Sequence, residues 1–147
     1  MTPGLDVTIA GVKLSNPIMT ASGCSGYGEE LSQVIPLSKL GALVTKTITP
    51  EPRLGHPPPR TAETASGMLN AIGLANVGID KFISEKLPFL QKQKTAVVVN
   101  IGGKTVDDYV YLCERLGECD RVDLIELNLG CPNVKEGGME FSSHPPL

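Results

Sequence analysis

The sequence lacks an apolar run that approaches the roughly 18 residues needed to cross a bilayer. Aromatic residues are scarce, at 4% with no tryptophan, and positive charge is not in excess, since 13 basic residues face 16 acidic ones. The net charge of −3 disfavours a nucleic-acid partner, which usually requires a basic surface. The first residues show no basic segment followed by an apolar one, so we expect no secretory leader, no membrane association and a cytoplasmic location.

Cysteine is sparse and shows no metal-binding spacing. The four cysteines form neither a Cys-x-x-Cys pair nor a cluster with histidine, so we expect no metal ion and no iron–sulfur cluster in this chain. Without a secretory context the thiols should be reduced. What is present is a globular composition, with 41% hydrophobic and 20% charged residues, and 147 residues are enough for one domain at most.

Short apolar runs alternate with longer amphipathic segments, a pattern typical of β/α units around a parallel sheet. A small hairpin is expected over Val7–Leu14, where a strand-like alternation is interrupted at Gly11. Four strands of the sheet are then expected, at Pro17–Ala21, Ala42–Ile48, Thr95–Ile101 and Val122–Leu129.

Three amphipathic helices are expected between these strands, over Glu29–Leu40, Ile79–Leu90 and Thr105–Leu116. Pro36 should shorten or kink the first helix, and Gly41 should cap it. Thr105 is the expected N-cap of the third helix. A loop of about 25 residues, ending at Asn76, connects the second strand with the second helix.

Polar residues follow the carboxyl ends of the expected strands, where active sites lie both in a (β/α)₈ barrel and in a doubly wound sheet. The glycines at positions 23, 26 and 28 have the spacing G-x-x-G-x-G, which differs from the dinucleotide fingerprint G-x-G-x-x-G and disfavours a Rossmann fold. The polar residues at strand ends are Ser22, Lys46, Thr47, Asn100 and Asn128.

Cys131 is a candidate for chemistry because it follows a strand end, in the segment N-L-G-C-P-N. Its thiolate could take a proton adjacent to a carbonyl group if water were excluded from the site. The alternative is a small apolar residue in a turn, and the spacing favours neither interpretation.

Lys46 and four asparagines are the other candidates. Lys46 ends an apolar strand, where a buried ammonium group needs a partner, so we expect it to face a ligand carbonyl or anion; the alternative is that it extends to solvent. The amides of Asn70, Asn100, Asn128 and Asn133 suit the edges of a cyclic imide or an isoalloxazine ring, although any one of them could be a turn or cap residue.

Five segments, in order along the chain, resemble the FMN-dependent dihydroorotate dehydrogenases. They are NPIMTASG (Asn16–Gly23), TKTIT (Thr45–Thr49), LNAIGLANVGID (Leu69–Asp80), VNIGG (Val99–Gly103) and ELNLGCPNVKEGG (Glu126–Gly138). The KEGG after CPNV resembles the NAD-linked class 1B catalytic subunits. The resemblance implies an α/β fold, a (β/α)₈ TIM barrel. Such a barrel typically has about 250 residues, so residues 1–147 would supply the first four β/α units, the N-terminal half of one FMN-binding domain truncated after the fourth strand and its loop.

The implied function is the FMN-dependent oxidation of (S)-dihydroorotate to orotate in the de novo synthesis of pyrimidines (UMP). Cys131 would be the base that removes the C5 proton while the C6 hydride passes to FMN. The implied substrate-binding residues are Lys46, Asn70, Ala71, Ile72, Gly73, Leu74, Asn128 and Asn133. The implied FMN contacts are Ala21, Ser22, Lys46, Thr47, Asn100 and Asn128.

The resemblance also implies a partner. Class 1B enzymes pass electrons to NAD through a second subunit that carries FAD and an iron–sulfur cluster, so we expect a homodimer of catalytic subunits with electron-transfer subunits, a heterotetramer. Two alternatives are kept. The chain could be a non-catalytic half-barrel fragment, or it could belong to a related flavin enzyme, since NLGCP, with Gly130 before the cysteine, also resembles tRNA-dihydrouridine synthases, and the dihydropyrimidine dehydrogenase flavin domain is a closer relative.

Overall fold

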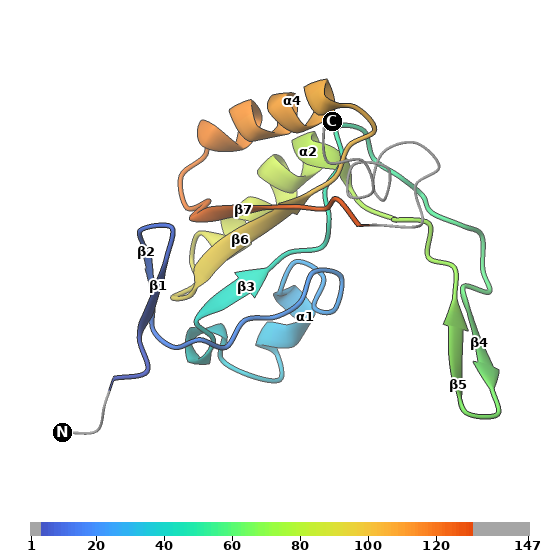
Figure 1. The fold of residues 1–147 in the computed structure, drawn as a ribbon, viewed down its shortest axis with the longest axis horizontal. Helices are drawn as coiled ribbons and strands as arrows, with labels where there is room; N and C mark the ends of the chain where they lie inside the picture. The colour runs from blue at the N-terminus through green and yellow to red at the C-terminus, as the bar shows by residue number, and fades with distance from the viewer. Residues whose placement is uncertain (1–3, 131–147) are drawn as a thin grey trace.

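A parallel sheet forms the centre of the computed structural model, which describes residues 4–130 (Figure 1). Its strands are β3 (Ala42–Val44), β6 (Ala96–Ile101) and β7 (Leu124–Leu127), which lie in this order. The spatial order follows the order in the chain, as in consecutive units of a barrel, whereas the order reverses in a doubly wound sheet. The predicted α/β class with a parallel sheet is confirmed.

The strand predicted at Pro17–Ala21 is wrong. This segment makes a single isolated bridge, between Met19 and Ala42, on the side of β3 opposite β6. Pro17 has no N–H to donate, and the Val44 N–H is accepted by the Thr20 side-chain Oγ1, at 2.9 Å, and not by a backbone carbonyl. The Thr20 N–H still donates to the Ala42 carbonyl, at 3.4 Å. The segment therefore occupies the position of a preceding barrel strand without forming a ladder.

The first predicted helix is broken, as expected from Pro36. Only α1 (Glu29–Ser32) and the 3₁₀ turn η1 (Leu37–Lys39) form, on either side of the proline. Gly41 does not cap a helix, so that prediction is wrong. It lies where the chain passes the backbone of Asn16, and a Cβ on Gly41 would overlap the Asn16 carbonyl oxygen.

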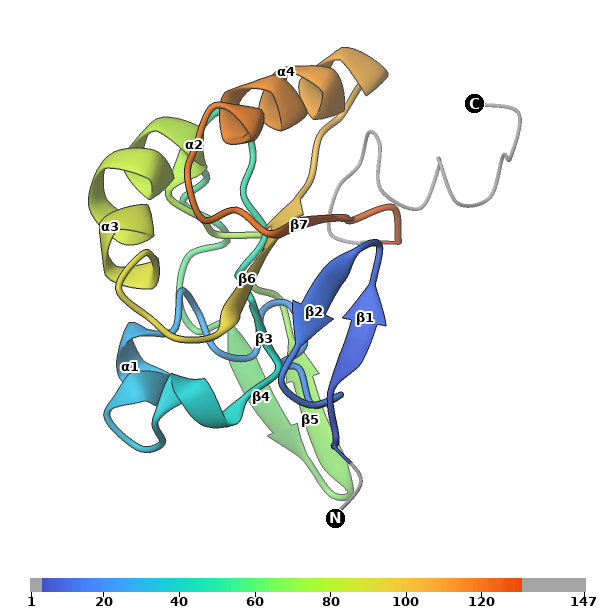
Figure 2. The ribbon, with the colours of Figure 1, turned by 90° about the vertical axis from the view of Figure 1, so that its left-hand side faces the viewer.

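The other two predicted helices are confirmed. The first is continuous through α2 (Gly78–Lys81), a π-helical turn η2 (Phe82–Lys86) and α3 (Leu87–Leu90), with the π turn just before Pro88, which has no N–H to donate. The second is α4 (Val106–Gly117), which begins with a capping box between Thr105 and Asp108. Figure 2 shows α2, α3 and α4 together on one face of the sheet.

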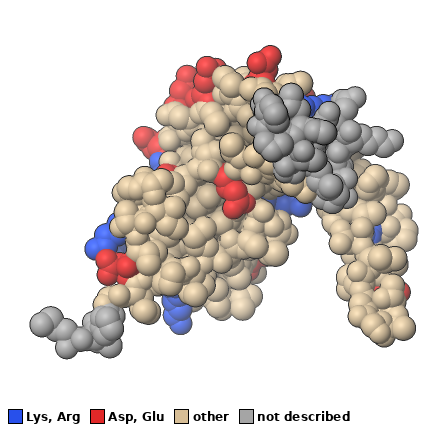
Figure 3. Space-filling model, viewed as in Figure 1, with Lys and Arg blue, Asp and Glu red and all other residues tan. Residues whose placement is uncertain are grey.

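Two antiparallel hairpins flank the sheet. The first, β1 (Val7–Ile9) with β2 (Val12–Leu14), matches the prediction. The second, β4 (Thr61–Thr64) with β5 (Gly67–Asn70), lies within the predicted loop and projects from the body of the molecule (Figures 1 and 3). None of the described helices combines the length and the apolar character that crossing a membrane would require.

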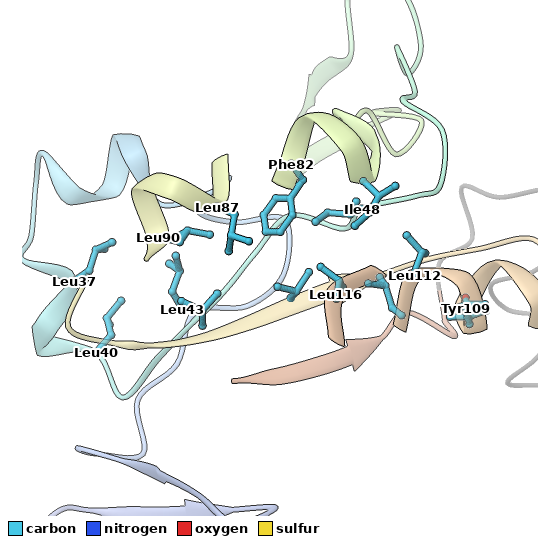
Figure 4. Close-up of a cluster of buried hydrophobic side chains, with 14 residues drawn as sticks. Leu37, Leu40, Leu43, Ile48, Phe82, Leu87, Leu90, Tyr109, Leu112 and Leu116 are labelled. Carbon is cyan, nitrogen blue, oxygen red and sulfur yellow. The ribbon is translucent and has the colours of Figure 1, made fainter. Parts of the chain in front are cut away.

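The two faces of the sheet have different cores. On the helix face, side chains from β6 pack with those of the helices, and Figure 4 labels Leu37, Leu40, Leu43, Ile48, Phe82, Leu87, Leu90, Tyr109, Leu112 and Leu116 in this cluster. The opposite face has a smaller apolar cluster, closed by the first hairpin. Its buried members are Leu14, Ala42, Val44 and Val98. In a barrel this second face is the interior.

Candidate functional site

On the face away from the helices, side chains change from apolar to polar along the strands. Side chains two residues apart share a face of a strand, so Val98 of β6 is followed by Asn100, and Leu124 of β7 is followed by Glu126. Asn128 comes just after β7, and Lys46 and Thr47 come just after β3. A polar cluster therefore lies at the carboxyl ends of the strands. We call it the strand-end cluster: Lys46, Thr47, Asn100, Glu126 and Asn128.

Asn100 is the most enclosed polar side chain of this cluster, at 2% exposure. Its Nδ2 donates to Glu126 Oε1 at 2.6 Å. Its Oδ1 is buried and has no hydrogen-bond partner among the described residues. A buried acceptor without a donor is costly, so this oxygen marks a place where a ligand donor would be stabilising.

Asn128 connects three elements at the same end of the sheet. Its Nδ2 donates to Thr47 Oγ1 at 3.2 Å, and its carbonyl oxygen accepts from the Tyr109 hydroxyl at 2.8 Å. Thr47 follows β3 and Tyr109 lies on α4, so the end of β7 is fixed to both. Thr47 and Asn128, two of the predicted site residues, are thus in contact at this end of the sheet.

Lys46 is half-buried and lies beside the segment that precedes α1. Its backbone N–H donates to the Gly26 carbonyl at 2.8 Å, and a Cβ on Gly23 would be 3.6 Å from its Nζ. No acidic side chain in residues 4–130 forms an ion pair with it. Of the two residues predicted to contact FMN nearby, Ser22 is half-buried and Ala21 is exposed.

Residues 70–74 divide between the projecting hairpin and the body. Asn70 is exposed on β5, opposite Thr61, and the next residue, Ala71, is also exposed. Ile72 is half-buried, and Gly73 and Leu74 are buried with positive φ angles of 72° and 54°. The structure thus brings Leu74 toward the end of the sheet, while Asn70 and Ala71 stand on the hairpin.

A cavity of about 400 Å³ lies beside the strand-end cluster. Of the predicted site residues within 4–130, Leu74 and Asn128 line this cavity and the others do not, so it adjoins the described part of the predicted site without coinciding with it. Arg53 and Lys104 place basic groups on its wall, and Glu51 and Asp108 place acidic ones. The remaining lining residues are Thr49, Pro50, Gly102 and Gly103.

Asn76 is a site residue that sequence reasoning missed. Its Oδ1 accepts from the Gly78 N–H at 2.9 Å, and its Nδ2 donates to the Leu74 carbonyl at 2.9 Å. The first bond is an Asx turn, which asparagine two residues before a glycine favours. The sequence A-N-V-G contains that signal. Asn76 thus holds the turn that presents Leu74.

The predicted residues Cys131 and Asn133 lie outside the described residues. The described cysteines, Cys24, Cys113 and Cys119, are free thiols, and burial raises the pKa of Cys119. Within residues 4–130, no group of three or more His, Cys, Asp or Glu side chains is arranged to hold a metal ion.

Comparison with known proteins places these residues in a family. A sequence model described as dihydroorotate dehydrogenase matches residues 4–147. The chain is 55% identical, over 97% of its length, to the protein named dihydroorotate dehydrogenase B (NAD(+)), catalytic subunit, of Listeria welshimeri and of Listeria innocua. The subunit of that name from Geobacter metallireducens is 52% identical over the same share. The chain covers 47% of each of these relatives, about half of their length.

Solved structures give the same result for the fold. The crystal structure of DHODH from Eimeria tenella in complex with ferulenol has a TM-score of 0.66 and 29% sequence identity, and the match covers 90% of this chain and 38% of that one. The ligand-free structure from the same organism also has a TM-score of 0.66, with 30% identity, and 40% of its chain is covered. The described sheet and helices therefore correspond to part of a longer fold.

Proposed function

The chain belongs to the dihydroorotate dehydrogenase family, and we propose that it is the N-terminal part of an NAD-linked catalytic subunit that oxidises (S)-dihydroorotate to orotate in pyrimidine synthesis. FMN, when bound, would supply the hydride acceptor for this reaction. The relatives that support the proposal are themselves named catalytic subunits of dihydroorotate dehydrogenase B.

The observation that carries the proposal is the buried, unpartnered Oδ1 of Asn100 in the strand-end cluster. An acceptor at the end of a parallel sheet suits a planar ligand with a ring N–H, such as a flavin. The residues around it supply a cation, a hydroxyl group and a second amide, which suit the carbonyl groups and ring nitrogens of the same ring. The proposed FMN contacts are Ala21, Ser22, Lys46, Thr47, Asn100 and Asn128.

The substrate is proposed to lie against residues from the same end of the sheet. Lys46 would attract the negative charge of dihydroorotate, and Asn128 and Asn133 would bind its amide edges. Residues 70–74 would close over it, and Leu74 lines the same cavity as Asn128. Cys131 Sγ would remove the C5 proton. The proposed substrate-binding residues are Lys46, Asn70, Ala71, Ile72, Gly73, Leu74, Asn128 and Asn133.

The complete fold is proposed to be a (β/α)₈ barrel. The strand order and the shared end for polar residues support this, and the edge of β7 would pair with the next strand. Because the relatives are named catalytic subunits, we also propose a partner subunit that carries FAD and an iron–sulfur cluster and passes electrons to NAD in the cytoplasm. The same proposal includes the assembly, a homodimer of catalytic subunits that binds electron-transfer subunits to form a heterotetramer.

The test uses a completed subunit, in which residues 1–147 are followed by the C-terminal half of the Listeria innocua relative. We expect it to bind FMN and to be bleached by dihydroorotate in the absence of oxygen. Cys131→Ser should slow flavin reduction by about 10²–10⁴, the range for loss of a positioned general base, while Cys113→Ser on α4 should not change it. An unchanged single-turnover rate in C131S would remove Cys131 from the role of base.

A second measurement addresses the alternative of a non-catalytic half-barrel fragment. Purified residues 1–147 alone are mixed with FMN and separated from free flavin. A colourless, aggregating protein is the result expected if FMN binding requires the complete barrel, since several barrel enzymes hold the cofactor phosphate with loops after the seventh and eighth strands. Stoichiometric FMN on the chain alone would count against the fragment alternative.

A further inference from the structure

Glu126 contacts the buried amide of Asn100 across the sheet. The register between β6 and β7 places the two residues directly opposite each other, and Asn100 Nδ2 donates to Glu126 Oε1 at 2.6 Å. Asn100 is only 2% exposed, so its amide has little contact with water while Glu126 is in place. Glu126 therefore determines the environment of one end of the Asn100 amide.

A carboxylate accepts hydrogen bonds and donates none, so it distinguishes the two ends of an amide. If the Asn100 amide turned by half a rotation, its Oδ1 would face Glu126 Oε1, and two acceptors would meet at hydrogen-bond distance without a proton between them. Glu126 therefore holds Nδ2 toward β7 and keeps Oδ1 on the other side of the amide.

The rest of Asn100 is already engaged in the sheet. Its N–H donates to Thr45 Oγ1 at 3.2 Å, and its carbonyl oxygen accepts from the Ile48 N–H at 2.9 Å. Oδ1 is thus the one acceptor of Asn100 that is left without a donor among the described residues. An oxidised isoalloxazine ring carries a single N–H, flanked by two carbonyl groups, and that group can satisfy such an acceptor.

We propose that Glu126 is a positioning residue for the cofactor, which orients Asn100 so that its Oδ1 accepts a hydrogen bond from the ring N–H of FMN. The inference rests on the proposed function, because it requires FMN at the strand-end cluster. Glu126 acts through Asn100, and its own contact is with the amide nitrogen.

The experiment measures the dissociation constant of FMN for the completed subunit after the flavin has been removed, by the change of flavin fluorescence on rebinding. In Glu126→Gln the new amide can present either a donor or an acceptor, so Asn100 loses its single orientation. We expect the dissociation constant to rise about 3- to 10-fold, the effect of one hydrogen bond. In the N100A background the same substitution should have no further effect.

The matched control is Asp123→Asn. Asp123 precedes β7, and its Oδ2 also bonds to β6, accepting from the Val97 N–H at 2.8 Å, but at the opposite end of the strands. Like E126Q, Asp123→Asn removes one negative charge from the β6–β7 pair. We expect its FMN affinity to match that of the unsubstituted protein. A cooperative thermal unfolding transition, measured for each variant without FMN, serves as the check that the variant is folded.

Two results would overturn the positioning role: an unchanged dissociation constant in E126Q, or an equal increase with and without the Asn100 side chain. A change confined to orotate binding, with FMN affinity retained, would overturn the assignment to the cofactor. If the unsubstituted completed subunit binds no FMN, the proposed function is wrong and this inference fails with it. If that subunit binds FMN and E126Q binds it equally well, this inference alone is wrong.

Discussion

Thr49 and Asn76 hold each other with hydrogen bonds in both directions. Asn76 Nδ2 donates to Thr49 Oγ1 at 2.9 Å, and Asn76 Oδ1 accepts from the Thr49 N–H at 3.2 Å, although the residues are 27 positions apart. The segment between them carries the β4–β5 hairpin and the turn at Gly73 and Leu74. One side chain thus closes the base of the segment that brings Leu74 to the cavity.

Asn76→Ala should lower the free energy of unfolding by about 1–3 kcal/mol, because the Thr49 N–H and the Leu74 carbonyl lose their partner in a half-buried site. Asn76→Asp, which keeps the acceptor and loses the donor, should have a smaller effect. Urea unfolding of the completed subunit measures both. If N76A unfolds at the same urea concentration as the unsubstituted protein, the segment is held by other contacts.

Much of the fold was predictable where sequence pattern and burial agree. β6 contains three consecutive buried valines and a buried isoleucine, and α4 has a capping box at Thr105, so both were expected at nearly their observed bounds. The β4–β5 hairpin was not predictable in this way. Every residue of both strands is exposed, so no alternation of apolar and polar residues exists to indicate it.

The sequence predicts where the site lies, but not which of its side chains contact each other. Polar residues at strand ends indicated Thr47, Asn100 and Asn128, which the structure brings to one end of the sheet. The pairing of Asn100 with Glu126 depends on the register of two strands, which no local pattern in the sequence contains. The polar position of Glu126 in a strand was visible, but its partner was not.

Gly41→Ala should lower the free energy of unfolding by about 3 kcal/mol, because the new methyl group would overlap the Asn16 carbonyl oxygen, and backbone cannot give way as a flexible side chain can. Gly117→Ala is the matched control. Gly117 ends α4 with no atom within 4 Å of its Cβ position, so this change should raise stability by about 0.4–1 kcal/mol. Thermal unfolding shows whether each substitution lowers or raises the stability. Equal changes in G41A and G117A would contradict the close approach at Gly41.

Thr105→Ala should lower the free energy of unfolding by about 0.5–2 kcal/mol through loss of the N-cap. Thr105 Oγ1 accepts from the Asp108 N–H at 3.2 Å, and Asp108 Oδ2 accepts from the Thr105 N–H at 3.2 Å. Thr105→Ser keeps the hydroxyl group and should retain most of the stability. Chemical unfolding of the two variants side by side tests the cap, and an equal loss in both would assign the effect to the methyl group of threonine.

The ion pair between Glu29 and Lys86 should contribute to stability in a pH-dependent way. Lys86 Nζ lies 2.8 Å from Glu29 Oε2, which joins α1 to η2, and the hydrogen bond to Glu29 raises the pKa of Lys86 above its ordinary value of 10.5. Since the folded-state pKa is the higher one, the contribution is fully present below about pH 10.5 and is lost as the pH rises through the folded-state pKa.

Lys86→Met therefore should lower the free energy of unfolding by about 0.2–1 kcal/mol at pH 7, because both side chains are partly exposed and water screens the pair. The difference from the unsubstituted protein should stay constant up to about pH 10.5 and shrink above it, since Lys86 then loses its charge in both states. Lys81→Met, on the neighbouring turn, where Lys81 is exposed, is the control for loss of a positive charge. Urea unfolding at several pH values measures the differences. A K86M effect that is unchanged above the pKa, or equal to that of K81M at pH 7, would show that the charge pair does not stabilise this contact.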